Sequence, residues 1–103
     1  MPFNFGSIAN KIVCGEVSGS ATAKQLPDID GGLVWLQALD TNAGNVYVGG
    51  AGVTIPDGTT DVTSGMTLAA GDWFGPLTIK NLSMLYIICT NAGDDITYFI
   101  EQA

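Results

Sequence analysis

Residues 77–101, LTIKNLSMLYIICTNAGDDITYFIE, decide the fold class of this chain. Residues 84–90 and 96–101 are rich in β-branched and aromatic side chains, and the turn formers Asn-Ala-Gly-Asp-Asp separate them at 91–95. This pattern predicts a terminal antiparallel β-hairpin. Because side chains alternate across a strand, both faces of 84–90 would be apolar. We therefore expect a second sheet or another subunit to cover the outer face.

The rest of the chain predicts further short strands separated by turn formers. They are expected at 11–17, 21–26, 33–39, 45–48 and 67–69, and from Trp73 onward. The Gly-, Thr- and Asp-rich stretch 49–65 is expected to be a long loop with one short strand. Seven or eight short strands at spacings of about 8 to 12 residues predict an all-β fold, an antiparallel, jelly-roll-like β-sandwich. No helix is expected.

This pattern also predicts where three aromatic residues lie. Trp35 lies in an apolar run bounded by glycines and is expected in the core. Trp73 and Phe74 are adjacent in a strand, so they should face opposite sides, one of them into the core. The other would need a partner surface.

Length and periodicity divide the chain into two parts. Residues 11–103 make a single β-sandwich domain of ordinary size. Residues 1–10 carry Phe3 and Phe5 but have no strand or helix period, and form an N-terminal arm. This arm is either a disordered leader or a segment tucked against its own sandwich, or it docks on a neighbouring subunit, where the phenylalanines would serve as anchors.

The charge balance excludes several partners. Ten acidic residues oppose three lysines, with no arginine or histidine, and the formal net charge is -7. Nucleic acid and anionic membrane surfaces both require a basic patch, which three scattered lysines cannot form. No apolar run is long enough to span a bilayer and no signal peptide is evident, so we expect synthesis in a reducing cytoplasm. Cys14 and Cys89 are expected to be buried free thiols, with a disulfide open only if their strands are neighbours.

The residue inventory also argues against an enzyme. Without histidine, Ser-His-Asp and Cys-His nucleophiles and the usual zinc and iron sites are excluded. The acidic pairs at 28/30 and 94/95 lie in turn sequences, where aspartate bonds the backbone, and this interpretation is favoured over acid-base catalysis. A weak surface Ca²⁺ site at 28–31 is an alternative for the first pair. We predict no catalytic, cofactor-binding or metal-binding residues.

Two segments carry a resemblance to a known class of proteins. These segments are GNVYVGG at 44–50 and MTLAAGDWFGPLTIKNLSMLYIICTNAGDDITYF at 66–99. They resemble a pattern in small virion proteins of tailed bacteriophages. In that pattern an NVYVG strand precedes a loop, an L-x-x-G-[DE] turn, a P-[LI]-x-[IV]-x-N-L-S segment and a terminal hairpin.

The resemblance implies a capsid decoration, or cement, protein without catalytic residues or cofactors. Such a protein binds the outer surface of the shell of major capsid protein, most often as a homotrimer, and is synthesised in the host cytoplasm. The aromatic arm and the adjacent aromatic pair themselves predict a partner surface, so the candidate interface residues are Phe3, Phe5, Trp73 and Phe74. The alternative is a phage tail or head-fibre component with a receptor- or carbohydrate-binding role, in which Trp73 or Tyr47 would stack on sugar rings.

Overall fold

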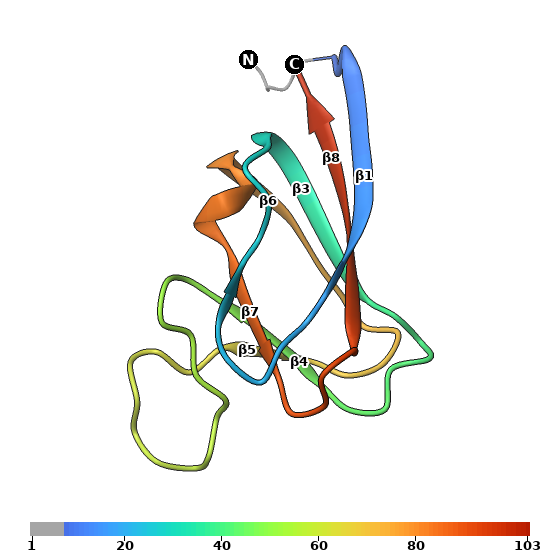
Figure 1. Ribbon diagram of the computed structural model, residues 1–103. Helices are drawn as coiled ribbons and strands as arrows, with labels where there is room; N and C mark the ends of the chain where they lie inside the picture. The colour runs from blue at the N-terminus through green and yellow to red at the C-terminus, as the bar shows by residue number, and fades with distance from the viewer. Residues whose placement is uncertain (1–7) are drawn as a thin grey trace.

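The computed structural model describes residues 8–103. They form two four-stranded antiparallel sheets with the connections between them (Figure 1). Sheet I has the order β1-β8-β3-β6, with β1 at Lys11–Ser18, β8 at Asp95–Gln102, β3 at Asp30–Ala38 and β6 at Trp73–Asn81. Sheet II has the order β2-β7-β4-β5, with β2 at Lys24–Gln25, β7 at Tyr86–Cys89, β4 at Val46–Gly49 and β5 at Met66–Leu68. A single 3-10 turn, η1 at Leu82–Met84, links β6 to β7. No helix in residues 8–103 has the length and apolar character needed to cross a membrane.

The strand pairing is nested. β1 pairs with β8, β2 with β7, β3 with β6 and β4 with β5, all antiparallel. The chain thus pairs like one long hairpin that is wound around itself, which is the arrangement of an eight-stranded jelly roll. Sheet I also brings β3 beside β8, and sheet II brings β4 beside β7. The predicted all-β sandwich is confirmed.

The core lies between the two sheets. Alternate residues of β3 and β8 point into it from sheet I, and alternate residues of β4 and β7 from sheet II. Burial of these aliphatic side chains is the main stabilising contribution of the sandwich. The core cluster consists of Leu26, Val34, Leu36, Ala38, Val46, Val48, Leu68, Leu82, Leu85, Ile87, Cys89, Ile96 and Ile100.

The predicted terminal hairpin is wrong in its pairing, although both of its strands exist. β7 belongs to sheet II and β8 to sheet I, so residues 90–94 cross from one sheet to the other. Asp94 fixes this crossing. Its side chain is buried, and its two carboxylate oxygens accept hydrogen bonds from the backbone amides of Ala43 and Gly44, at 2.9 Å each. Ala43 and Gly44 belong to another crossing, the one between β3 and β4.

The long loop between β4 and β5 projects from one end of the sandwich (Figure 1). Its expected short strand is reduced to one isolated bridge, between Thr54 and Ser64. Asp57 accepts hydrogen bonds from Thr59, and Asp61 accepts them from Thr63. These bonds lower the pKa of both carboxyls because they stabilise the ionised form. The loop aspartates therefore serve as turn formers.

The two cysteines do not share an environment, contrary to the expectation that both are buried. Cys89 is completely buried in the core, whereas Cys14 is exposed on β1. β1 and β7 belong to different sheets, so the condition for a disulfide between the two cysteines, neighbouring strands, is not met.

Candidate functional site

The outer face of sheet I carries an unusual set of large side chains. In β3, Val34, Leu36 and Ala38 are buried in the core, so alternation turns Trp35 and Gln37 outward. The placement of Trp35 in the core, expected from the sequence, is therefore wrong. On β8 the same alternation buries Ile96 and Ile100 and leaves Phe99 exposed.

Strand register aligns these outward residues in two rows. Glu16 of β1 lies opposite Thr97 of β8, which lies opposite Gln37 of β3, and Gln37 in turn lies opposite Trp73 of β6. We name these four residues the polar row. The aromatic row, one pleat further along, consists of Cys14, Phe99 and Trp35. Within it the rings of Trp35 and Phe99 meet edge to face, with centroids 5.8 Å apart and planes at 70°.

The two rows line an open groove of about 700 Å³. At Trp35 the register between β3 and β6 shifts, so Trp35 has no paired residue on β6. β6 nevertheless comes close to β3 at Gly75, where an added Cβ would lie 2.6 Å from the carbonyl oxygen of Val34 and where φ is +128°. Only glycine accommodates both conditions. The groove residues are Cys14, Gly15, Glu16, Trp35, Leu36, Gln37, Trp73, Thr97, Tyr98 and Phe99.

Two polar side chains of the groove, Gln37 and Thr97, already donate hydrogen bonds to backbone carbonyl groups. Gln37 Nε2 donates to the carbonyl oxygen of Gly71, at 3.3 Å, and Thr97 Oγ1 donates to the carbonyl oxygen of Gln37, at 3.4 Å. What these two side chains still offer the groove is chiefly acceptor oxygen. The carboxyl of Glu16 adds to it.

Glu16 also interacts with Asp95, its diagonal neighbour on the same face of β8. Interaction with the Asp95 side chain, followed by desolvation and repulsion, raises the pKa of Glu16, and the same interaction lowers the pKa of Asp95. While both groups are ionised neither can donate, and within residues 8–103 Asp95 Oδ1 is buried without a hydrogen-bond partner. A proton on Glu16 makes it a donor to Asp95.

The structure separates the predicted interface residues. Trp73 is 63% exposed at the groove, whereas Phe74 packs against the core from the inner side of β6, as expected for adjacent strand residues. Phe3 and Phe5 lie outside the described residues. Glu16, Thr97 and Gln37 were not predicted as site residues because only register across three strands brings them together.

The acidic pairs have the structural surroundings of turn residues. Asp28 Oδ1 accepts a hydrogen bond from Asn81 Nδ2 at 2.9 Å, and Asp94 holds the crossing described above. Within residues 8–103 no three His, Cys, Asp or Glu side chains gather as a metal site would require.

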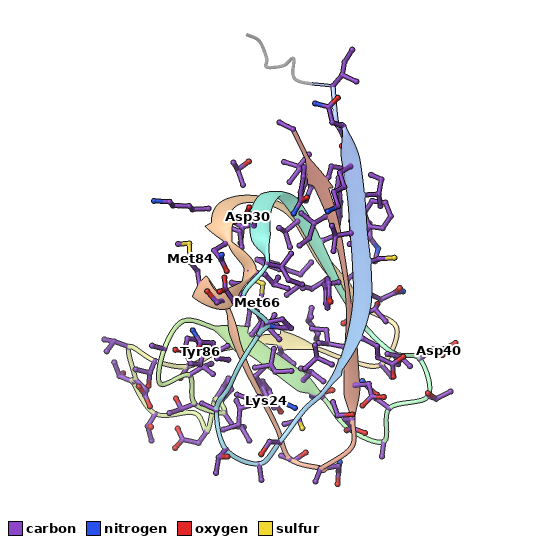
Figure 2. The ribbon with its side chains drawn as sticks, turned by 45° about the horizontal axis from the view of Figure 1, so that its top comes forward. Lys24, Asp30, Asp40, Met66, Met84 and Tyr86 are labelled. Atoms are coloured by element: carbon purple, nitrogen blue, oxygen red, sulfur yellow. The ribbon has the colours of Figure 1, made fainter. Side chains whose placement is uncertain are left out.

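A second exposed apolar group lies away from the groove. Met66 and Met84 are 56% and 54% exposed, and Figure 2 shows Met84 and Tyr86 on the side of the molecule that carries η1 and the β4–β5 loop. These side chains do not line the groove, so they supply control positions for experiments on it.

Comparison with known proteins finds no matching family model and no matching curated protein. A solved structure that matches comes from work on Bacillus endospore appendages, described as a novel family of disulfide-linked pili. The two chains share 18% sequence identity, the match covers 90% of this chain and 87% of the other, and the TM-score is 0.49. A likeness at this level carries no functional argument.

Proposed function

We propose that this chain is a non-enzymatic capsid decoration protein of a tailed bacteriophage that docks the outer face of sheet I on the major capsid protein. The observation that carries the proposal is the open apolar surface of that face. Trp73 is 63% exposed, Ile12 51% and Phe99 42%, and all three project from the same side of one sheet. Exposed large apolar side chains on one sheet face are typical of protein interfaces.

The proposal also accounts for the composition. A net charge of -7 keeps the protein away from the packaged nucleic acid and maintains its solubility before assembly. The protein would be made in the host cytoplasm and located on the capsid exterior. As a homotrimer it would present three weakly binding faces, and their high effective concentration would give strong overall attachment. Binding to the assembled shell would stabilise that state by mass action.

The direct experiment is reconstitution on particles that lack the protein. Purified protein is mixed with such capsids, and occupancy is measured by co-sedimentation, with the melting temperature of the shell as a second readout. We expect the wild type to bind and to raise the shell's melting temperature. Trp73→Ala should reduce occupancy, whereas Met84→Ala, an equally exposed apolar position outside the groove, should leave it unchanged.

Equal occupancy of the two variants would contradict docking through sheet I. If wild-type protein did not bind particles at all, the decoration function itself would be wrong.

The second candidate function, a receptor- or carbohydrate-binding part of a tail or head fibre, is favoured by one observation. The exposed ring of Trp73 lies beside the polar side chains of Gln37 and Thr97 in a groove, an arrangement that suits a sugar ring. Retardation in affinity gels that contain host polysaccharide, combined with failure to bind capsids, would support this candidate over decoration.

A further inference from the structure

We propose that the groove between the polar and aromatic rows binds the guanidinium group of an arginine side chain on the partner's surface. This inference rests on the proposed docking function and names the chemical group that the docking face recognises. Three properties of the groove lead to it: its hydrogen-bonding inventory, its aromatic rings and its charge.

The hydrogen-bonding inventory calls for a ligand that donates. One of the two amide N–H groups of Gln37 is used by the carbonyl of Gly71, and the hydroxyl hydrogen of Thr97 by the carbonyl of Gln37. Gln37 Oε1, the lone pairs of Thr97 Oγ1 and the carboxylate of Glu16 remain to accept, against one remaining N–H of Gln37. A guanidinium has five N–H donors and no acceptor, so it matches this set. A phosphate or carboxylate, which only accepts, would meet three acceptor groups and a single free N–H.

The aromatic rings favour a flat cation. Trp73, Trp35 and Phe99 all line the groove, and the rings of Trp35 and Phe99 already contact each other edge to face. A cation over an indole or phenyl face is attracted by the ring quadrupole, and guanidinium can in addition stack as a plane. A compact, strongly hydrated ammonium makes fewer of these contacts.

The charge of the site completes the match. The groove lining includes Glu16 and no lysine, in a protein of net charge -7. On β8, Asp95 and Glu101 lie on the same face as Thr97 and Phe99, and the charge of Lys24 on β2 acts on Asp95, although Lys24 Nζ is bonded to the carbonyl oxygen of Ser18 at 2.8 Å. A cation in the groove would offset the repulsion between the Glu16 and Asp95 carboxylates and so favour the ionised form of Glu16.

The test is a titration of the isolated protein with N-acetyl-arginine methylamide, followed by NMR at the two tryptophan indole N–H groups. The matched probe is N-acetyl-citrulline methylamide, which has nearly the same shape and no charge. We expect saturable shifts of both indole signals with arginine and none with citrulline. Removal of one ring contact at an exposed site should weaken binding about three- to fivefold in Trp73→Ala. Glu16→Gln should also weaken it, and Met84→Ala should leave it unchanged.

The outcomes separate this inference from the docking proposal. If citrulline shifts the indoles as much as arginine does, or a neutral oligosaccharide does so instead, the guanidinium assignment is wrong. If capsids bind normally through Trp73 but arginine causes no shift, decoration stands and this inference fails. If arginine binds but capsids do not, the groove assignment stands and the docking proposal fails.

Discussion

Cys89 lies in the core, where its Sγ donates weakly to the carbonyl oxygens of Asn91, at 3.2 Å, and Ser20, at 3.5 Å. Burial, reinforced by the charge of Asp94, raises the pKa of this thiol, so little thiolate forms near neutral pH. Cys14 is exposed on β1. We therefore predict that a thiol reagent such as dithionitrobenzoate modifies one cysteine per native chain and two after denaturation. Cys14→Ser should abolish the native reaction, whereas rapid modification of that variant would place Cys89 outside the core.

Glu16 should make stability depend on pH through its pairing with Asp95. Its pKa is raised in the folded state, so its stabilising contribution is complete at acid pH and is lost as pH rises through the folded pKa. Glutamine keeps a donor toward Asp95 and cannot ionise. Glu16→Gln should thus raise the melting temperature at pH 7 and leave it nearly unchanged at pH 4. Thermal melts at the two pH values test this, and an equal effect at both would rule out a shared proton.

At the level of single residues, the sequence predicted which residues of a strand face opposite sides, but not which of the two sides faces the core. Alternation correctly placed Trp73 and Phe74 on opposite faces, because that relation is local to one strand. It did not predict which face of sheet I is the core, so Trp35 and Cys14 were expected inside and lie outside. Hydrophobic character alone cannot distinguish a residue in the core from a residue on a surface that binds a partner.

At the scale of elements, Asp94 links two of the crossings between the sheets, β3 to β4 and β7 to β8. Both of its oxygens accept backbone amide hydrogen bonds from Ala43 and Gly44. Asp94→Ala leaves these donors without a charged acceptor, and we predict a loss of about 2–3 kcal/mol in the free energy of unfolding. For a domain of this size the loss corresponds to roughly 10–20 °C in melting temperature.

Asp40→Ala is the matched control for the crossing. Asp40 is an exposed aspartate near the same β3–β4 connection, labelled in Figure 2, and its substitution should change stability by less than about 0.5 kcal/mol. Urea unfolding of the three proteins tests the prediction. Equal stabilities for the two variants would show that Asp94 does not hold the crossings together.

The crossing at residues 90–94 also explains why the terminal hairpin was predicted wrongly. Turn formers between two β-rich runs are compatible with a hairpin and equally with a crossing between sheets. The decision comes from contacts about 50 positions away in the chain, between Asp94 and residues 43–44, and from the pairing of β8 with β1 and β3. Strand positions were thus predictable from local composition, whereas strand partners were not.

At the scale of the whole molecule, the candidate site is a product of topology. The jelly-roll order brings the first strand beside the last and sets β3 and β6 next to them, so residues 16, 37, 73 and 97 share one row. No residue spacing in the sequence indicates that these four residues lie in one row. Of its members, only Trp73 was predicted as an interface residue, because adjacent strand residues face opposite sides and either Trp73 or Phe74 therefore had to point away from the core.

Assembly is the last property that belongs to the whole molecule, and light scattering measures it directly. A decoration protein of the proposed kind should have a native mass of three times the 10.7 kDa of the chain. If the predicted arm of residues 1–10 docks on a neighbouring subunit, its deletion should convert the trimer to monomers while far-UV circular dichroism remains unchanged. A trimer that survives deletion would assign assembly to the sandwich itself. A full-length protein that stays monomeric at all concentrations would argue against the trimeric decoration proposal and for the receptor-binding candidate.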